Sequence, residues 1–184
     1  MDSNCENNIL LILDLDETLI HATKDPLDTE PDFQYADYFV YLRPNLSPFL
    51  KTVNEKFKLA IWSSADDKYV EDIISRIKPS EIEFQFIWGR SRCTYRRDYD
   101  LDEYVYEKRL KKVKKQGFKL EQILIIDDSP NKTRDNYGNA IYVHPFEGDS
   151  KDNELLVLME FLALIQDSAN VRNVEKRGWR NKVT

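Results

Sequence analysis

A chain of 184 residues with 41% hydrophobic and 33% charged residues can bury one sizeable core and has the composition of a soluble globular protein. Its formal net charge of -6 argues against general nucleic-acid binding through phosphate contacts, and no apolar run is long enough to cross a membrane. Cys5 and Cys93 make no disulfide framework and indicate free thiols in a reducing compartment. We therefore expect one domain over 1–184, located in the cytoplasm or in a eukaryotic nucleus, with no nucleic-acid or membrane partner.

The first predicted element is an apolar run that ends in two carboxylates. Residues 9–13 read Ile-Leu-Leu-Ile-Leu, and Asp14 and Asp16 follow. A continuous Ile/Leu run bounded by polar residues is typical of a strand buried on both faces. Side chains at i and i+2 of an extended chain point the same way, so the two carboxylates project together. Because they repel each other unless a proton or a cation lies between them, and because oxygen ligands suit Mg²⁺ or Ca²⁺, we expect a divalent cation here.

The middle of the chain alternates between strands and helices. The predicted elements are an acidic irregular segment at 24–40, a strand at 38–42, a strand at 57–62 that ends in Ser63 and Ser64, a helix around Val70 to Ile77, and a strand around Phe84 to Trp88. Apolar residues at helical spacing predict the helix, and alternating aromatic residues predict the last strand.

The second half continues the alternation. Its predicted elements are an Arg- and Tyr-rich loop at 90–100, a basic helix from Tyr104 to Lys115, a buried strand at 123–126 that ends in Asp127 and Asp128, a short strand at 140–143, and an apolar helix at 152–166. Strands that alternate with helices predict a Rossmann-like, doubly wound parallel sheet. The tail from Arg172 is basic and is expected to be frayed, so we divide the chain into a core at about 9–166 and an extension at 167–184.

Polar side chains follow the ends of several predicted strands. These ends converge in space in a doubly wound sheet. The candidate residues are Asp14 and Asp16, Ser63, the lysines around Lys111, and Asp127 and Asp128. Together they supply a carboxylate nucleophile, a second carboxylate, a hydroxyl, a cation and an acidic pair, which suits phosphoryl transfer through an aspartyl-phosphate.

The order of these motifs resembles the haloacid-dehalogenase superfamily of phosphotransferases. Within it, the chain is similar to the phosphatases of the RNA polymerase II C-terminal domain and their NLI-interacting-factor-like relatives. The resemblance is carried by Asp14-Leu15-Asp16-Glu17-Thr18, Leu42-Arg43-Pro44, Trp62-Ser63-Ser64-Ala65 with Lys68-Tyr69, and Ile126-Asp127-Asp128-Ser129-Pro130. It covers roughly residues 9 to 166, nearly the whole chain.

The resemblance implies a role for each residue of the first two motifs. Asp14 attacks the phosphorus and becomes the aspartyl-phosphate, whereas Asp16 protonates the leaving alkoxide and then activates the attacking water. This second role requires a raised pKa for Asp16. Thr18 orients Asp16 or its backbone. Ser63 donates a hydrogen bond to a phosphoryl oxygen, and Ser64 is either the N-cap of the following helix or a second substrate contact.

The resemblance also implies a phosphate-binding lysine. The relatives place it before the last acidic pair with a glycine between, which fits Lys111 best. Lys108 and Lys112 stay open as alternatives, because helical spacing lets only one lysine of this run face the site. The loop residue Arg90 either contacts the phosphorylated substrate or belongs to a solvated basic loop.

The implied metal is Mg²⁺. Asp128 is expected as a direct ligand with Asp127 in support, together with Asp14 and the main-chain carbonyl of Asp16. Relatives often carry Asp-Asn at the last pair, so Asp-Asp makes this site more negative. An acidic strand-to-loop turn without a metal is the alternative for this pair.

The gaps between motifs leave no room for a cap domain, only a short insertion after the first strand. An uncapped cleft admits a side chain of a large partner, so phosphoserine or phosphothreonine of a protein is the expected substrate. The alternatives are a phosphatase of small metabolites, a catalytically inactive phosphoprotein-binding adaptor of the same fold, and a receiver domain. A receiver carries its phosphoacceptor after the third strand, where this chain has Trp88-Gly89-Arg90 and no carboxylate.

Overall fold

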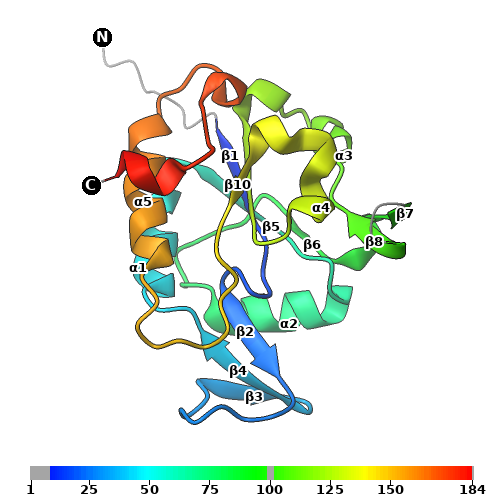
Figure 1. Ribbon diagram of the computed structural model, residues 1–184, viewed down its shortest axis with the longest axis vertical. Helices are drawn as coiled ribbons and strands as arrows, with labels where there is room; N and C mark the ends of the chain where they lie inside the picture. The colour runs from blue at the N-terminus through cyan, green and yellow to red at the C-terminus, as the bar shows by residue number, and fades with distance from the viewer. Residues whose placement is uncertain (1–8, 99–101, 184) are drawn as a thin grey trace.

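The centre of the fold is a five-stranded parallel sheet (Figure 1). The computed structural model describes residues 9–98 and 102–183. In spatial order the strands are β10 (Ala140–Tyr142), β9 (Ile123–Asp127), β1 (Leu10–Leu13), β5 (Lys58–Trp62) and β6 (Ile87–Trp88). Every neighbouring pair runs parallel, so the predicted Rossmann-like architecture is confirmed.

The earliest strand of the chain, β1, lies in the middle of this sheet. Leu13 at its end is in register with Ile61 of β5 and Ile126 of β9. The main-chain N–H of Asp14 continues the ladder by donating to the carbonyl of Ile126 at 3.0 Å. The residues that follow these three strands therefore leave the sheet at one common edge.

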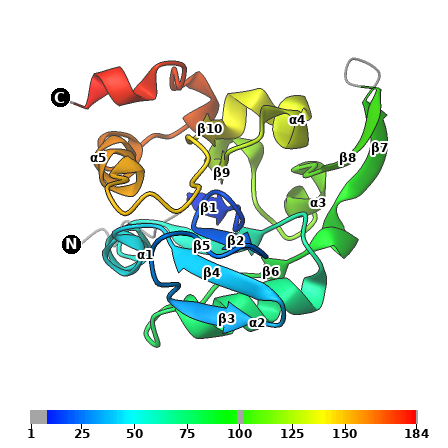
Figure 2. The same cartoon turned by 60° about the horizontal axis from the view of Figure 1, so that its bottom comes forward.

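Helices cover both faces of the sheet (Figures 1 and 2). They are α1 (Leu46–Asn54), α2 (Asp67–Ile77), α3 (Lys111–Lys114), α4 (Pro130–Thr133) and α5 (Glu154–Ile165). Leu11 and Leu13 of β1 pack with apolar residues of α1, α2 and α5, whereas Leu10 and Ile12 pack with Trp62 and α3 on the other face. This explains why the first strand has no polar alternation: both of its faces are buried.

A small antiparallel sheet is inserted between β1 and α1. Its strands are β2 (Ile20–Thr23), β4 (Tyr38–Leu42) and β3 (Phe33–Tyr35), in that spatial order. The strand predicted at 38–42 is thereby confirmed. The sheet projects from the carboxyl edge of the main sheet, at the bottom of Figure 1, and no cap domain is formed by the described residues.

The basic helix predicted from Tyr104 to Lys115 is wrong over its first half. Glu103–Glu107 is instead a strand, β8, which pairs with β7 (Thr94–Asp98) in an antiparallel hairpin, and α3 comprises Lys111–Lys114 alone. Part of the loop predicted at 90–100 is consequently a strand, preceded by the 3₁₀ turn η1 (Arg90–Arg92). Because this segment is a hairpin and not a helix, its lysines lie at different positions relative to the sheet than the prediction implied.

The basic tail is packed rather than frayed. It forms two 3₁₀ turns, η4 (Val171–Asn173) and η5 (Trp179–Lys182). The buried Trp179 indole donates to the carbonyl of Tyr142 at 2.9 Å, which covers the edge strand β10. The Lys176 ammonium donates to the carbonyls of Gly138 at 2.9 Å and Val174 at 3.0 Å.

Two features bear on the expected environment of the protein. Cys93 is a buried free thiol, whereas Cys5 lies outside the described residues. Within residues 9–98 and 102–183, no helix combines the length and apolar composition needed to cross a membrane.

Candidate active site

The carboxylate of Asp14 is the centre of the site, and its two oxygens have different surroundings. Oδ1 accepts hydrogen bonds from the main-chain N–H of Leu15 at 2.8 Å and lies 2.7 Å from the Lys108 ammonium. Oδ2 is buried and has no hydrogen-bond partner among the described residues. Burial alone would raise the pKa of Asp14, but the positive charges of Lys108 and Lys132 outweigh it and lower the pKa, so the carboxylate stays ionised.

Asp16 lies beside Asp14 in a different environment. Its Oδ1 accepts a hydrogen bond from the Tyr69 hydroxyl at 2.7 Å, and its Oδ2 accepts one from Ser63 Oγ at 3.2 Å. Burial raises the pKa of Asp16, although the hydrogen bond from Tyr69 opposes the shift. The two carboxylates therefore have opposite pKa shifts, which is the usual basis for separate nucleophile and acid roles.

The lysine beside Asp14 is Lys108, and the expectation of Lys111 is corrected. Lys108 is fully buried, with Nζ 2.7 Å from Asp14 Oδ1 and 2.7 Å from Asp127 Oδ2. Lys111 is exposed at the start of α3, and the Lys112 ammonium donates to the carbonyls of Arg92 and Cys93. The reason is the β8 strand: it ends at Glu107 and delivers the next residue to the sheet edge.

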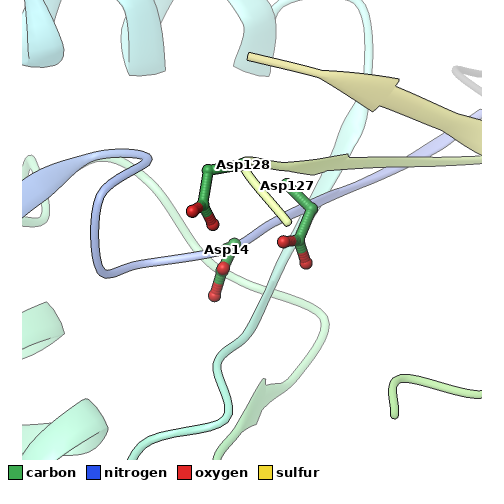
Figure 3. A group of neighbouring side chains, drawn as sticks. All are labelled: Asp14, Asp127 and Asp128. Carbon is green, nitrogen blue, oxygen red and sulfur yellow. The ribbon is translucent and has the colours of Figure 1, made fainter. Parts of the chain in front are cut away.

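Asp14, Asp127 and Asp128 form one acidic group (Figure 3). One oxygen of each lies within 4.8 Å of the others. Asp127 already accepts hydrogen bonds from Lys108 and from the main-chain N–H of Ser129, whereas Asp128 Oδ1 is buried without a hydrogen-bond partner in the described part of the chain. The Asp128 oxygen that accepts no hydrogen bond from the described residues, with the carboxylates of Asp14 and Asp127 beside it, fits a hard divalent cation such as Mg²⁺. The carboxylate of Asp16 faces Ser63 and Tyr69 and does not belong to this group.

Thr18 does not hold Asp16 as expected. Its side chain is buried, and Oγ1 has no hydrogen-bond partner within the described residues. Its carbonyl accepts a hydrogen bond from the buried Arg43 guanidinium at 3.0 Å, and Arg43 also pairs with Asp152 at 2.8 Å. The turn after the motif is instead closed by the main chain, with Glu17 in the left-handed region at φ 57 and its N–H donating to Ile20.

The hydroxyl of Ser63 is fixed at the site, but Ser64 is not a helix cap. Ser63 Oγ accepts from the N–H of Ala65 at 3.0 Å while it donates to Asp16. The N-cap of α2 is Asp66, whose carboxylate accepts from the N–H groups of Lys68 and Tyr69. The N-cap prediction for Ser64 is therefore wrong.

An open cleft of about 470 Å³ adjoins Asp16. It is lined by Asp16, Glu17, Ala22, Tyr35, Tyr38, Ala65, Asp66, Tyr69 and Arg90. Arg90 is exposed and donates Nε–H to the carbonyl of Ser64 at 2.9 Å, with its guanidinium 5.0 Å from the centre of the Tyr106 ring. The cleft thus brings Arg90 to the same opening as Asp16, with the small inserted sheet as one wall.

Two residues of the site had no predicted role. Tyr69 follows the Ser63 motif in α2, and Lys132 follows the last acidic pair in α4. The signal for Tyr69 was its place on the first turn of a helix that begins at the sheet edge. Lys132 had no comparable signal, because Asp128 precedes α4 and the two side chains do not share a helix face.

The parallel sheet, the paired aspartates after its central strand, the serine after the next strand and the acidic pair after β9 define a haloacid-dehalogenase-type phosphatase. Residues 9–172 match the family model of the NLI interacting factor-like phosphatases. The chain therefore belongs to this family of phosphatases.

Its relatives agree with this assignment. The chain is 32% identical over 171 residues to CTD small phosphatase-like protein 2 of Dictyostelium discoideum, covering 89% of this chain and 28% of that protein. It is 29% identical over 189 residues to CTD nuclear envelope phosphatase 1B of Danio rerio, covering 93% of this chain and 74% of the relative. The chain thus spans about a quarter of the first relative and about three quarters of the second.

Solved structures share the fold. Fcp1, an essential RNA polymerase II CTD phosphatase, superposes with a TM-score of 0.61 at 18% identity, over 97% of this chain and 62% of that chain. A haloacid dehalogenase-like hydrolase from Bacteroides fragilis gives a TM-score of 0.51 at 14% identity, over 80% of this chain and 91% of that one. At these identities the likeness concerns the fold alone.

Proposed function

We propose that this chain is a Mg²⁺-dependent phosphatase that works through an aspartyl-phosphate on Asp14, and that its substrate is phosphoserine or phosphothreonine in a protein. The carrying observation is the asymmetry of the Asp14 carboxylate. Lys108 and the N–H of Leu15 fix Oδ1, while Oδ2 lacks a hydrogen-bond partner among the described residues. An ionised carboxylate with one oriented oxygen and one available oxygen is suited to nucleophilic attack.

The reaction divides between the two aspartates. Asp14 Oδ2 bonds to phosphorus as the ester P–O bond breaks, and Asp16 gives its proton to the departing serine or threonine oxygen. The raised pKa of Asp16 favours the protonated form that this step needs. Asp16 then accepts a proton from the water that attacks phosphorus, the acyl-phosphate bond to Asp14 breaks, and inorganic phosphate leaves.

The remaining residues of the site would hold the metal ion and the phosphoryl group and neutralise negative charge. Asp14, Asp127 and Asp128, with the main-chain carbonyl of Asp16, would hold Mg²⁺, which supplies positive charge to the phosphoryl oxygens. Ser63 provides an oriented hydroxyl for one of those oxygens, and Lys108 keeps Asp14 ionised and fixed. We assign Thr18 no contact with the reacting atoms.

A protein substrate is supported by the open cleft beside Asp16. Its walls of tyrosine side chains and the exposed Arg90 offer contacts to the residues that flank a phosphorylated side chain, with Ser64 next to them. Relatives are named as phosphatases of the CTD type, which is consistent with a protein substrate. A small metabolite would leave most of these walls without a contact.

For location we propose a reducing compartment, the cytoplasm or the nucleus. The buried Cys93 thiol is free, and burial raises its pKa, which keeps it as an unreactive thiol. Several relatives are named for the nuclear envelope.

The test is hydrolysis of p-nitrophenyl phosphate with Mg²⁺, with EDTA and in Asp14→Asn, followed by matched panels of phosphopeptides and phosphorylated metabolites. We expect Mg²⁺-dependent turnover that Asp14→Asn abolishes, and a higher kcat/KM on phosphopeptides. Turnover confined to metabolites would contradict the substrate class. A folded, Mg²⁺-loaded protein without any turnover would contradict the enzyme and favour a phosphoprotein-binding adaptor.

A further inference from the structure

Lys132 is a second, partly buried cation beside the proposed nucleophile. It lies in the short helix α4, directly after the acidic pair, and its side chain is only 22% exposed. Its Nζ is 3.6 Å from Asp14 Oδ2 and 3.7 Å from Asp128 Oδ1. These are the two buried carboxylate oxygens of the acidic group that have no hydrogen-bond partner among the described residues.

The two lysines of the site contact opposite oxygens of Asp14. Lys108 contacts Oδ1 at hydrogen-bond distance, whereas Lys132 stands at a longer distance from Oδ2. Their main chains are joined, because the N–H of Lys108 donates to the carbonyl of Lys132 at 2.7 Å. The backbone of Lys132 is therefore fixed relative to that of Lys108, the other lysine of the site.

The bonding of the two lysines also differs. Lys108 is fully enclosed and makes short contacts to two carboxylates, so it is committed to the protein. An ammonium group has three donors, and the ion pairs of Lys132 are both longer than the usual N–H···O range. Lys132 thus keeps the capacity to donate to an incoming group.

We propose that Lys132 binds the phosphoryl group of the substrate as a second cation and offsets the negative charge that Asp128 adds to this site. This rests on the proposed function. If Asp14 Oδ2 forms the bond to phosphorus, the phosphoryl oxygens arrive on the side of Asp14 where Lys132 stands. A phosphate monoester brings about two negative charges into a site of four aspartates, and a charge-assisted hydrogen bond from Lys132 offsets part of this repulsion.

The same position gives Lys132 an opposite effect on the metal. Its positive charge lies beside Asp14 and Asp128, which would hold Mg²⁺, so it disfavours a divalent cation there. Removing this charge should therefore tighten Mg²⁺ binding and weaken phosphate binding. A residue that only supported the fold would not move these two affinities in opposite directions.

The experiment compares Lys132→Met, Lys132→Arg and the control Lys114→Met, which removes an exposed lysine of α3. Calorimetry measures the Kd of Mg²⁺ and, at saturating Mg²⁺, the Kd of inorganic phosphate. For Lys132→Met we expect a phosphate Kd about tenfold higher, the scale of one charged hydrogen bond, and a Mg²⁺ Kd at least about twofold lower. Lys132→Arg should restore most of the phosphate affinity, and Lys114→Met should match the wild type.

Steady-state kinetics with p-nitrophenyl phosphate adds a second readout. Lys132→Met should raise KM more than it lowers kcat, since phosphate binding is the main loss. Phosphate and Mg²⁺ affinities within twofold of Lys114→Met would overturn the proposal. If the wild type itself shows no turnover, the proposed function fails, yet the two binding constants still decide the role of Lys132. Lys132→Gln replaces the Met variant if a melting curve shows that the latter is unfolded.

Discussion

At the scale of single residues, the site depends on how two neighbouring aspartates are differentiated. Both are buried, yet Asp14 faces two lysines while Asp16 faces two hydroxyls. Positive charges stabilise a carboxylate far more than neutral hydroxyl donors do. The pKa of Asp14 is therefore lowered, whereas that of Asp16 is raised. These neighbours support the proposed division of work between Asp14 as nucleophile and Asp16 as acid.

The assignment of Lys108 is tested by comparing Lys108→Met with Lys111→Met. Loss of Lys108 leaves Asp14 Oδ1 with the N–H of Leu15 alone among the contacts described above, and leaves two buried carboxylates without their shared cation. We expect kcat to fall about 100-fold or more, the scale for losing one preorganised electrostatic contact, while Lys111→Met leaves kcat unchanged. The measurement is turnover at saturating Mg²⁺ on variants with cooperative urea unfolding. A loss of activity in Lys111→Met, with Lys108→Met unaffected, would restore the lysine expected from sequence.

Tyr69 is a positioning residue for Asp16. Tyr69→Phe removes the hydroxyl that donates to Asp16 at 2.7 Å but keeps the ring that packs edge-on against Tyr35. We expect kcat to fall about tenfold, on the scale of one hydrogen bond, with KM little changed.

The matched control is Tyr38→Phe, which removes another hydroxyl from the same cleft. Steady-state kinetics on p-nitrophenyl phosphate separates the two variants. An equal loss in both would mean that tyrosine hydroxyls of the cleft serve substrate binding in general, and would contradict a specific role toward Asp16.

At the scale of elements, what could be predicted depends on where an element gets its stability. The strands β1, β5 and β9 are buried on both faces, so their sequences are continuous apolar runs, and their ends located Asp14, Ser63 and Asp127 correctly. The hairpin of β7 and β8 is different. It is held by cross-strand pairs such as the stacked rings of Tyr95 and Tyr104, 4.7 Å apart, and it has no continuous apolar run.

This difference explains the error over the lysine. Without the hairpin, the run from Tyr104 onward looked like one basic helix, and the spacing to the acidic pair favoured Lys111. Alternation in Tyr104-Val105-Tyr106, with the middle residue buried, was the available signal for a strand. A strand ending at Glu107 makes Lys108 the first residue at the sheet edge.

The tail is a second case in which amino-acid composition does not predict how a segment packs. Its lysines and arginines suggested a frayed extension, but Lys176 binds backbone carbonyls and Trp179 fills a gap beside α5, with its ring 5.6 Å from that of Phe161. Long cationic side chains can bury their stems and use their charged ends locally. Composition alone cannot reveal this, because one of the acceptors, the carbonyl of Gly138, is 38 residues away in the sequence.

The tail should therefore contribute to stability. Trp179→Ala removes a buried indole and its hydrogen bond to Tyr142, and we expect the free energy of unfolding to fall by about 3 kcal/mol. Arg177→Ala is the control, since this exposed side chain forms a local ion pair with Glu175, and its loss should change the value by less than about 0.5 kcal/mol. Urea denaturation gives both numbers. Equal stability of the two variants would mean that the tail detaches before the core unfolds.

At the scale of the whole molecule, negative charge is concentrated where the strands end. The chain carries a net charge of -6, and four aspartates meet at the carboxyl edge of the sheet with Lys108 and Lys132 as the cations beside them. Such a cluster raises the free energy of the folded state unless positive charge is supplied. The metal proposed for the site therefore has a consequence for global stability as well as for catalysis.

We expect Mg²⁺ to raise the melting temperature of the wild type. At a concentration 100 times Kd, binding adds about 2.7 kcal/mol, which corresponds to roughly 5–10 °C for a chain of this size. Asp128→Ala should lose most of this gain because it removes the available oxygen Oδ1. In EDTA the same variant should be at least as stable as the wild type, since the repulsion between Asp14 and Asp128 is gone.

The control for this experiment is Asp37→Ala, which removes an exposed carboxylate from the turn between β3 and β4 and so makes the same change in net charge. Its melting temperature should respond to Mg²⁺ as the wild type does. Identical Mg²⁺ shifts in Asp128→Ala and Asp37→Ala would place the cation elsewhere on the acidic surface. A wild type with no shift at millimolar Mg²⁺ would contradict metal binding to the free protein. It would mean that Lys108 and Lys132 already neutralise the aspartates of the site. The metal would then have to bind together with the phosphorylated substrate.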